Sequence, residues 1–270
     1  MARIRTLERL PAPNVYIMVK LGPMRTVAVI PARLASTRLP RKALREIAGT
    51  LLIGRVYEAV RSSPLLNDGD VIIATDSDEI MEVCQRHGWK AQMTSAAHRS
   101  GTERVHEISQ SVAADVHLAD VYLNVQGDEP LTRAEHIAGL IEIMQDPAVQ
   151  VGTLKTPAAP ADIDNPNAVK VVTDSGRRAL YFSRATIPYD RDGAGSRHFK
   201  HLGFYAYRKP ALDHFVTLPE SSLERSERLE QLRFLENGIP IHVAETPYDT
   251  IGVDTEEDLR RVEQILRSTF

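Results

Sequence analysis

The stretch TVAVIPARLASTRLPRKAL, residues 26–44, carries the strongest structural signal in the chain. It begins with an unbroken apolar run over residues 27–31 that is rich in β-branched side chains. A short run of this kind is typical of a strand whose two faces are both buried, as in the parallel sheets of α/β proteins. We therefore expect an α/β fold with this strand inside its sheet.

A basic loop follows this strand directly. Ligands in open α/β sheets bind at the carboxyl ends of the strands, where this loop begins, and its composition suits a polyphosphate. A solvated basic loop is the alternative, but four cations within ten residues repel one another unless an anion lies among them. The cations are Arg33, Arg38, Arg41 and Lys42, and the small residues between them include Ser36 and Thr37.

Composition restricts the partners and the compartment. The 270 residues carry a net charge of −3, so the chain as a whole attracts neither nucleic acid nor an anionic membrane. No stretch approaches the roughly 20 apolar residues that span a bilayer. The single cysteine, Cys84, excludes an internal disulfide and favours core packing on a predicted helix over a nucleophilic role. We expect a soluble, cytoplasmic protein.

Residues 1–23 have the character of an N-terminal extension. They mix charged residues with three prolines and lack the apolar segment and cleavage site of a secretory signal. The predicted first strand begins just after Met24, so Met24 is a second candidate start. We expect residues 1–23 to be dispensable and residues 24–270 to form the functional domain.

Alternating helices and strands follow the basic loop. Apolar residues four apart predict a helix over residues 51–60, and a buried strand over residues 71–74 leads into a second helix. A short strand over residues 89–93 precedes a helix that Ser100 opens, with Glu103 placed as in a capping box. This βαβα order favours a mostly parallel sheet.

An acidic turn ends the next strand. In DVYLNVQGDEP, residues 120–130, alternating apolar residues predict a strand, and Asp128 and Glu129 follow it before a proline. If this strand is parallel to the first, Asp128 emerges at the same sheet edge as the basic loop. Mg²⁺ binds through one or two carboxylates plus substrate phosphates, so Asp128 is a candidate metal ligand. An ordinary turn aspartate is the alternative.

A second lobe begins near residue 157. Three prolines in residues 157–166 interrupt the βα rhythm, and residues 174–176 form a predicted hairpin turn between two strands. Further on, HLGFYAYR places His201 and Tyr205 on one face of another strand, because strand side chains alternate. From residue type alone, these two side chains and Arg184 are more often packing or surface residues than ligands.

Two helices are predicted near the C-terminus. Leucines spaced by three, with a glycine as a stop, predict one amphipathic helix over residues 223–238, on which Glu230 and Gln231 face solvent. Thr255 can cap a final helix, and Asp254 stands just before it. Asp254 is therefore a second candidate metal ligand.

Several of these motifs together are similar to one family. The loop IPARLASTRLP and its following lysine, the segment HRSGTER, the turn NVQGDEP, and later ALYFSRATIP, HLGFYAY and LEQLR resemble the 3-deoxy-manno-octulosonate (Kdo) cytidylyltransferases, or CMP-Kdo synthetases. The resemblance covers about residues 24–266. The chain departs from the family's usual Gly-Lys-Pro by having Arg41-Lys42-Ala43.

The resemblance implies a fold and an activity. The fold is a Rossmann-like nucleotide-diphospho-sugar transferase fold, with a mostly parallel central sheet and a smaller second lobe. Residues 157–220 form most of that sugar-binding and dimerisation lobe. The activity is transfer of CMP from CTP to the anomeric hydroxyl of Kdo with release of diphosphate, which activates Kdo for lipopolysaccharide synthesis. Mg²⁺ is the implied cofactor, and a homodimer is the implied assembly.

The resemblance also assigns roles to residues. Catalysis falls to Lys42, Arg33, Asp128 and Asp254, of which the two aspartates are also the metal ligands. The nucleotide-binding set is Arg33, Ser36, Arg38, Lys42, Asp76, Ser100, Gly101, Thr102 and Arg104. The sugar-binding set is Gln126, Arg184, His201, Tyr205, Glu230 and Gln231. Arg184 is expected to pair with the sugar carboxylate, because a planar guanidinium meets a carboxylate through two hydrogen bonds.

Other functions compete with this one. G-x-x-x-x-G-K-[ST] and G-x-G-x-x-G do not occur, so the sequence supports neither a Walker-type NTPase nor a dinucleotide enzyme, and H-E-x-x-H and G-x-S-x-G are absent as well. Within the enzyme class, the acceptor can instead be sialic acid or an amino-substituted Kdo. A non-catalytic nucleotide-binding regulator on the same fold is disfavoured, because it needs neither carboxylate. We expect CTP and Kdo as substrates, and no nucleic acid or membrane as partner.

Overall fold

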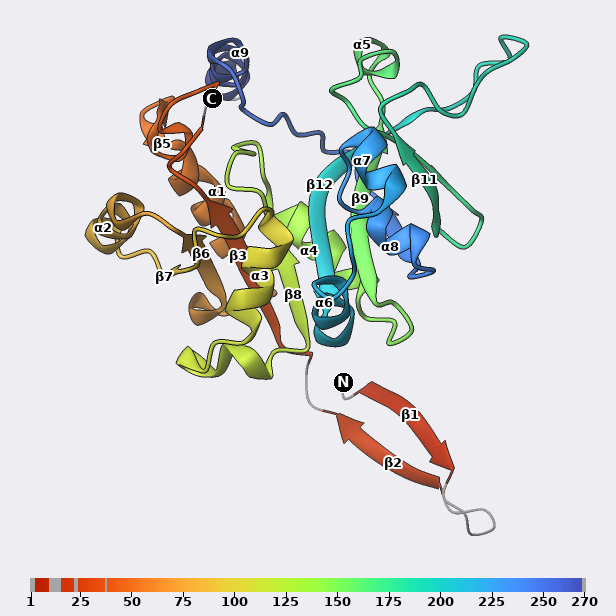
Figure 1. Ribbon diagram of the computed structural model, residues 1–270, viewed down its shortest axis with the longest axis horizontal. Helices are drawn as coiled ribbons and strands as arrows, with labels where there is room; N and C mark the ends of the chain where they lie inside the picture. The colour runs from red at the N-terminus through yellow and green to blue at the C-terminus, as the bar shows by residue number, and fades with distance from the viewer. Residues whose placement is uncertain (1–2, 10–15, 22–23, 37, 269–270) are drawn as a thin grey trace.

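The computed structural model describes residues 3–9, 16–21, 24–36 and 38–268, so Thr37 lies outside the described residues. Figure 1 shows helices and strands alternating through the first half of the chain. The strands are β1 (Arg3–Arg9), β2 (Tyr16–Leu21), β3 (Thr26–Ala32), β4 (Glu46–Ile47), β5 (Thr50–Leu51), β6 (Val71–Thr75), β7 (Ala91–Met93), β8 (Val121–Asn124), β9 (Val151–Pro157), β10 (Lys170–Thr173), β11 (Ala179–Ser183), β12 (Phe199–Arg208) and β13 (Ile241–Glu245). The α-helices are α1 (Leu52–Arg61), α2 (Asp78–His87), α3 (Gly101–Ser109), α4 (Ala134–Ile143), α5 (Pro160–Ile163), α6 (Lys209–Phe215), α7 (Ser222–Glu227), α8 (Leu232–Glu236) and α9 (Glu256–Ser268).

One mixed sheet of nine strands organises the described residues. Its order is β11-β10-β12-β8-β3-β6-β7, and β9 pairs with both β12 and β13. Strands β8, β3, β6 and β7 run parallel, whereas β12 is antiparallel to β8, β9 and β10. The predicted mostly parallel central sheet is thus confirmed in these four strands. Strand β12 continues the same sheet into the second lobe.

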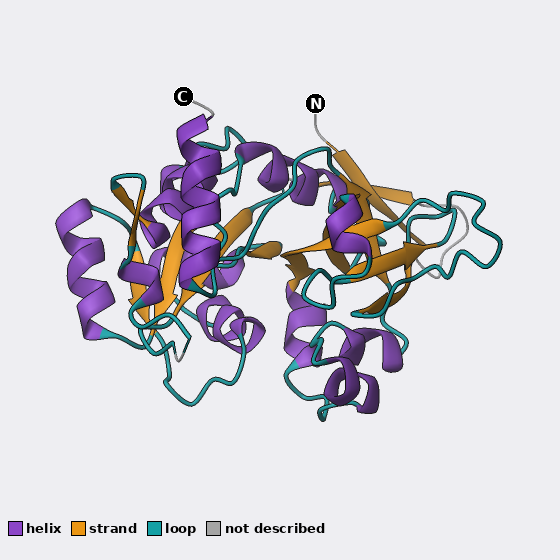
Figure 2. Cartoon of the chain, turned by 90° about the horizontal axis from the view of Figure 1, so that it is seen from above, coloured by secondary structure: helices purple, strands orange, loops and turns teal. Residues whose placement is uncertain are grey.

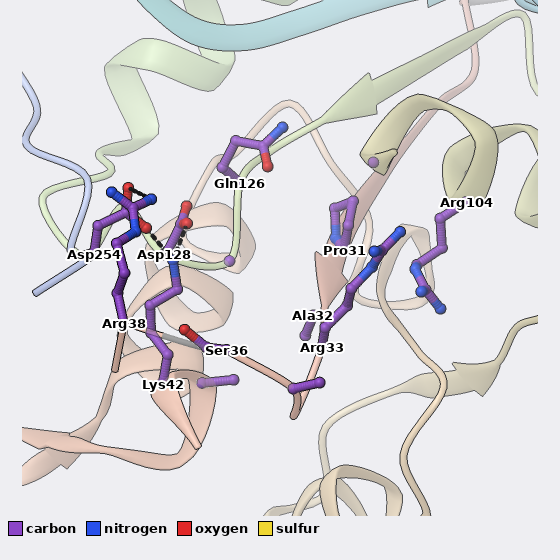
Figure 3. Close-up of a pocket in the computed structure, with 14 residues that line it drawn as sticks. Pro31, Ala32, Arg33, Ser36, Arg38, Lys42, Arg104, Gln126, Asp128 and Asp254 are labelled. Carbon is purple, nitrogen blue, oxygen red and sulfur yellow. Dashed lines mark hydrogen bonds and ion pairs between the residues drawn. The ribbon is translucent and has the colours of Figure 1, made fainter. Parts of the chain in front are cut away.

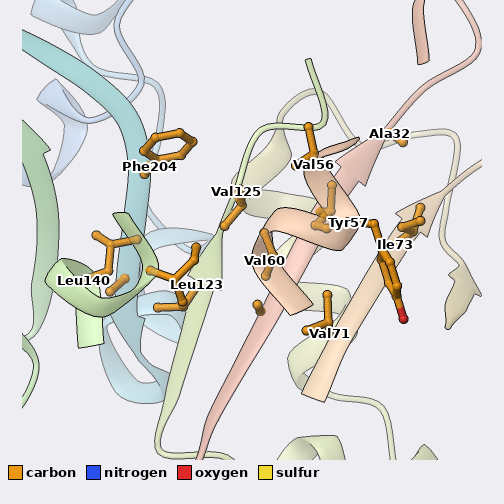
Figure 4. Packing of buried hydrophobic residues seen from close by; sticks show 14 of the residues in the cluster. Ala32, Val56, Tyr57, Val60, Val71, Ile73, Leu123, Val125, Leu140 and Phe204 are labelled. Atoms are coloured by element: carbon orange, nitrogen blue, oxygen red, sulfur yellow. The ribbon is translucent and has the colours of Figure 1, made fainter. Parts of the chain in front are cut away.

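Strand β3 shows why its sequence is apolar throughout. Ala28 and Ile30 belong to one core cluster, which includes residues of α1 and α4 (Figure 4). Val27 and Val29, which alternate with them, belong to a second cluster that includes residues of α3. Because alternate residues of a strand face opposite sides, the continuous apolar run serves two helical layers.

The last helix returns to the first lobe. In Figure 2, α9 lies against the group of elements that holds the parallel strands. Its Leu259 and Val262, and Val253 before it, form a cluster with Leu39 of the basic loop. This packing brings the segment around Asp254 back to the loop that follows β3.

Most of the local predictions are confirmed. Helices α1 and α2, strands β6 and β7, and the β10–β11 hairpin lie where the sequence predicts them. Cys84 is buried in the core, and burial raises the pKa of its thiol to about 11. Ser100 caps α3 by accepting a hydrogen bond from the backbone N–H of Glu103 at 3.2 Å. The Glu103 carboxylate, however, accepts from the backbone of Arg99, so the predicted capping box is half formed.

The single helix predicted over residues 223–238 is wrong. The structure has two short helices, α7 and α8, and Arg228 between them has a left-handed backbone with φ of 55°. A buried ion pair between Arg233 and Glu224, with N–O distances of 2.7 and 2.5 Å, ties α8 to α7. The leucine spacing continues through the break and therefore does not reveal it. Glu230 and Gln231 lie in this break and not on a solvent-facing helix.

The described part of residues 1–23 consists of two strands. Strands β1 and β2 pair antiparallel and form a two-stranded sheet separate from the nine-stranded one (Figure 1). These two strands are not among the predicted elements, and the dispensability of this segment stays a prediction. None of the helices among the described residues has the length and apolar character that crossing a membrane requires.

Candidate active site

Two loops meet at the carboxyl ends of the parallel strands. The basic loop leaves β3, and the acidic turn leaves β8, with Val29 of β3 opposite Asn124 of β8. Together with the segment around Asp254, these loops line a cleft of about 340 Å³ (Figure 3). The predicted site residues that line it are Arg33, Ser36, Arg38, Lys42, Gly101, Arg104, Gln126, Asp128 and Asp254.

Lys42 joins the two candidate metal ligands. Its Nζ donates to Asp128 Oδ2 at 2.6 Å and to Asp254 Oδ1 at 2.7 Å (Figure 3). Burial lowers the pKa of Lys42, but the two carboxylates outweigh burial and raise it above its ordinary value. For Asp254, burial alone would raise the pKa of the carboxyl group. The nearby cations of Lys42 and Arg38 outweigh this effect and hold the pKa of Asp254 below its ordinary value. Lys42 is therefore charged and Asp254 ionised at neutral pH.

The other predicted residues of the basic loop lie at the rim of the cleft. Arg38 donates to Asp254 Oδ2 at 2.8 Å and is largely exposed. The Arg33 guanidinium donates to the backbone carbonyl of His98. Ser36 Oγ accepts a long hydrogen bond, 3.4 Å, from a backbone N–H of the same loop. Exposed guanidinium contacts stabilise a fold little, so these side chains can exchange their protein partners for phosphate oxygens.

Arg41 shows what the departure from Gly-Lys-Pro does to the loop. Its backbone is left-handed, with φ of 56° and ψ of 33°. This conformation costs an L-residue about 1 kcal/mol and is open to glycine without that penalty. The Arg41 guanidinium forms an ion pair with Glu79 of α2. Lys42 then begins a short 3-10 helix, η1 (Lys42–Leu44), and its side chain lines the cleft.

Gly127 lets the acidic turn approach β3. A Cβ at this position would lie 2.7 Å from the carbonyl oxygen of Pro31 and 3.0 Å from Cδ1 of Ile53. The first distance is shorter than real Cβ atoms show. Asp128 is thus placed by the absence of a side chain on its neighbour. Gly127 is not among the predicted site residues, although a glycine between a strand and an acidic pair is a signal for such a close approach.

Arg104 and Asp76 form an ion pair beside the cleft. Arg104 Nη2 lies 2.8 Å from Asp76 Oδ2, and the guanidinium also donates to Thr94 Oγ1. The Arg104 side chain is fully buried, yet its Nε has no partner among the described residues. Asp76 lines a second, adjoining cleft together with Arg33 and Arg41. A buried N–H without a protein partner is a candidate donor to a ligand oxygen.

Thr102 connects the start of α3 to the second lobe. Its Oγ1 donates to Glu230 Oε2 at 2.6 Å and lies 3.3 Å from Tyr207 Oη. A predicted nucleotide-binding residue therefore contacts a predicted sugar-binding residue. Tyr207 is absent from the predicted set, although its period-two spacing from Tyr205 along β12 was a signal for it.

His201 and Tyr205 lie together on β12, as predicted. Their ring centroids are 5.4 Å apart, and both side chains are buried. Thr153 Oγ1 lies 3.1 Å from His201 Nε2 and donates its one proton to the carbonyl of Phe204 at 2.7 Å, so Nε2 of His201 carries a hydrogen. Burial lowers the pKa of His201 to about 3. The imidazole is therefore neutral at physiological pH.

Two predicted sugar-binding residues hold polar atoms without partners. Tyr205 Oη and Gln231 Nε2 are buried and make no hydrogen bond with the described residues. Buried polar atoms are nearly always hydrogen-bonded, so both are candidates for contact with a polar ligand. Gln126 lines the cleft and donates to Asn124 Oδ1 at 3.3 Å. The other predicted sugar-binding residues do not line it.

Arg184 lines neither of the two clefts. Its guanidinium donates to the backbone carbonyls of Glu227 at 2.7 Å, Pro166 at 2.9 Å and Arg228 at 3.5 Å. These bonds tie the end of α7 to the second lobe. A guanidinium has five N–H donors, so two remain for the sugar carboxylate. The pairing of Arg184 with that carboxylate stays a prediction.

The donor set at the cleft suits a cation shared with substrate. Within the part of the chain that the structure describes, no three acidic, histidine or cysteine side chains gather around one point. Asp128 and Asp254 nevertheless reach the same Lys42 ammonium from different segments. Mg²⁺ needs only one or two protein carboxylates when substrate phosphates and water complete its coordination, so the two aspartates fit it.

Known proteins resemble this chain over nearly its whole length. The cytidylyltransferase family model matches residues 27–245. A 3-deoxy-manno-octulosonate cytidylyltransferase from Koribacter versatilis is 67% identical over 259 residues, which make up 96% of this chain and 95% of that protein. Its counterpart from Acidobacterium capsulatum is 56% identical over 247 residues, or 91% of this chain and 98% of that protein.

Solved structures agree with this similarity. A CMP:2-keto-3-deoxy-manno-octonic acid synthetase complexed with CTP is 40% identical with a TM-score of 0.85, covering 91% of this chain and 100% of that one. A 4-diphosphocytidyl-2C-methyl-D-erythritol synthase from Anaerococcus prevotii is 12% identical with a TM-score of 0.61, covering 90% and 99%, and it shows the shared fold alone. The predicted Rossmann-like nucleotide-sugar transferase fold is confirmed.

Proposed function

Because the chain belongs to the 3-deoxy-manno-octulosonate cytidylyltransferase family, we propose that it transfers CMP from CTP to Kdo in the cleft around Lys42. The observation that carries this proposal is the convergence of Lys42, Asp128 and Asp254 at the carboxyl ends of β3 and β8. A cation and two carboxylates beside a basic loop suit a polyphosphate and its counter-ion. The 40% identical synthetase solved with CTP supports the choice of nucleotide.

The reaction exchanges one P–O bond for another. The anomeric hydroxyl oxygen of Kdo bonds to the α-phosphorus of CTP, the bond from that phosphorus to the bridging oxygen of the diphosphate breaks, and the hydroxyl proton is released. In such transfers a protein contributes positioning and charge neutralisation. Arg33, Arg38 and Lys42 supply the positive charge along the triphosphate. Arg104, with its unpartnered Nε, supplies a donor on the other side of the cleft.

We expect Mg²⁺ to bind Asp128 and Asp254. When bound, the ion neutralises phosphate charge and lowers the pKa of the attacking hydroxyl. Turnover should therefore fall to background in excess EDTA and return when Mg²⁺ or Mn²⁺ is added beyond the chelator. Full turnover in excess EDTA would contradict this expectation.

The region around β12 suits a hydroxyl-rich acceptor. The imidazole of His201 is neutral, and Tyr205 Oη and Gln231 Nε2 lack protein partners. Glu230 joins this group to the start of α3 through Thr102. Neutral donors and acceptors of this kind match sugar hydroxyls, and the charged Arg184 at the edge of the lobe remains the candidate for the carboxylate.

Family membership supports three further parts of the proposal. We expect a cytoplasmic enzyme that activates Kdo for lipopolysaccharide synthesis and assembles as a homodimer through the lobe of residues 157–220. Sedimentation of the purified chain tests the assembly, and a monomer at micromolar concentration would contradict it.

An acceptor panel tests the function. Product formation from CTP should be measured with Kdo, an amino-substituted Kdo and sialic acid. We expect kcat/KM for Kdo to exceed the other values at least about tenfold, since a site built to hydrogen-bond a substrate group discriminates strongly against an analogue that alters it. A higher value for another acid would transfer the assignment to that acid. Absence of turnover with every acid would favour the nucleotide-binding regulator.

A further inference from the structure

Glu129 is a carboxylate beside the site that the proposed chemistry does not use. It follows Asp128 in the acidic turn after β8. Its Oε2 accepts a hydrogen bond from Thr250 Oγ1 at 2.5 Å, and Thr250 is buried. The acidic turn is thereby connected to a segment more than a hundred residues further along the chain.

The Glu129 carboxylate also packs against β12. A Cβ on Gly203 would lie 3.3 Å from Glu129 Oε1, so the absence of a side chain on Gly203 makes room for the carboxylate. Gly203 lies within the register shift of the β12–β9 pairing, between Leu202 and Tyr205. Glu129 therefore links three parts of the fold: the acidic turn to which it belongs, strand β12, and the segment that contains Thr250.

That C-terminal segment delivers Asp254. Residues 246–254 form no helix or strand, so the position of Asp254 depends on where this segment is held. Lys200 Nζ on β12 donates to the carbonyl of Thr250 at 2.9 Å, and the backbone N–H of Val253 donates to the carbonyl of Asp128 at 2.9 Å. Thr250 is thus held from two sides, four residues before the carboxylate that reaches Lys42.

We propose that Glu129 is a positioning residue, whose hydrogen bond with Thr250 sets the C-terminal segment so that Asp254 faces Asp128 across Lys42. This inference rests on the proposed function, because it concerns the spacing of the two carboxylates that the reaction uses. Glu129 touches neither substrate nor metal in this role. Groups that orient a first set of ligands typically affect metal affinity or activity by about 10- to 100-fold when they are removed.

Thr250→Val tests the inference, because it removes the hydroxyl and keeps the shape of the side chain. Thr250→Ser keeps the hydroxyl and serves as the rescue. Ser222→Ala is the matched control, since Ser222 Oγ donates to the carboxylate of Glu236 at 2.7 Å on the surface of α7. The full-length chain should be assayed for kcat, KM for CTP, melting temperature and the affinity for Mn²⁺ in the presence of CTP without sugar.

We expect Thr250→Val to lower kcat about tenfold and to weaken Mn²⁺ affinity several-fold, with KM for CTP changed less than about twofold. Thr250→Ser should return both values to within about twofold of the wild type, and Ser222→Ala should leave both unchanged. A Thr250→Val enzyme with wild-type kcat and Mn²⁺ affinity, or a Thr250→Ser enzyme as impaired as Thr250→Val, would overturn the inference.

Gly203→Ala provides a second route that leaves Thr250 intact. The added methyl group would lie 3.3 Å from Glu129 Oε1, so the carboxylate must shift by a few tenths of an ångström. We expect a smaller loss of kcat and Mn²⁺ affinity in the same direction, and wild-type values would count against the inference even if Thr250→Val does not fold. Failure of the proposed function has a different signature. In that case the wild-type chain itself makes no CMP-Kdo, whereas failure of this inference leaves the wild type active and the variants equal to it.

Discussion

Gly127 has no side chain, and this lets the turn that carries Asp128 lie close to β3. The substitution Gly127→Ala, which adds one methyl group, tests whether this close approach matters. In Gly127→Ala the new Cβ meets the Pro31 carbonyl oxygen at 2.7 Å, so the acidic turn must move away from β3. Displacement of a catalytic group by about 1 Å can cost on the order of a hundredfold in rate. We expect kcat to fall between about tenfold and a hundredfold while the protein still folds.

The control for this substitution is Gly69→Ala. Gly69 has nothing within 4 Å of an added Cβ and an ordinary backbone conformation, so its variant should retain wild-type kcat. Equal rates for Gly127→Ala and the wild type would show that the turn adapts without moving Asp128.

Burial of His201 predicts how stability depends on pH. The unfolded imidazole takes up a proton below its ordinary pKa of about 6.5, whereas the folded one resists protonation until about 3. The unfolded state therefore binds more protons in this window, and the free energy of unfolding falls as the pH falls from 6.5 toward 3, by up to about 1.4 kcal/mol per pH unit. Urea unfolding between pH 7 and pH 4 should show a flatter slope for His201→Gln than for the wild type. The matching substitution at the exposed His214 is the control and should leave the slope unchanged. A wild-type slope in His201→Gln would contradict the assignment of this pH dependence to His201.

The left-handed backbone of Arg228, between α7 and α8, should lower the stability of the fold, and this can be tested. Arg228 is exposed and left-handed, with φ of 55° and ψ of 45°. Glycine adopts this conformation without the Cβ penalty, so Arg228→Gly should raise the free energy of unfolding by about 0.5 to 1 kcal/mol. Arg225→Gly, three residues earlier inside α7, should lower it by about 0.8 kcal/mol. Denaturant unfolding of both variants checks the opposite signs, and a loss of stability in Arg228→Gly would refute this account of the break.

Periodicity located most elements but not this one. Strands β3, β6 and β8 are short apolar runs with helices on both sides of the sheet, so their pattern specifies them. The leucines of residues 223–238 instead lie in and between two short helices that the buried Arg233–Glu224 pair links. A contact between side chains nine residues apart leaves no trace in hydrophobic spacing. Family resemblance, and not periodicity, singled out Glu230 in the break.

At the scale of the whole chain, the sequence likewise predicts the position of some site residues and not of others. The rule that ligands bind at the carboxyl ends of parallel strands places the basic loop and Asp128 together from sequence. It does not place Asp254, whose segment has no regular structure and reaches the cleft through the packing of Val253 and α9 on Leu39. The contacts of Glu129 with Thr250 and Gly203 could not be predicted from the sequence either, because they depend on how β12 is positioned against a turn that is distant in sequence.

The proposed reaction depends above all on the convergence of Asp254 with Asp128 on Lys42, and Asp254→Asn removes one of these two carboxylates. The cap of α9 is formed by Thr255 and Asp258 through hydrogen bonds of 2.9 and 3.2 Å, so the Asp254 carboxylate is not needed to begin the helix. The asparagine keeps the shape and removes one charge from the proposed metal site.

We expect turnover of Asp254→Asn at limiting Mg²⁺ to fall at least about a hundredfold, on the order of 2.7 kcal/mol in the barrier, while CTP binding measured without sugar falls much less. Glu256→Gln is the control, because Glu256 lies two residues further, pairs with Arg45 on the surface and does not line the cleft. A near-wild-type rate for Asp254→Asn would contradict the account and leave Asp128 as the only protein carboxylate at the reacting phosphates.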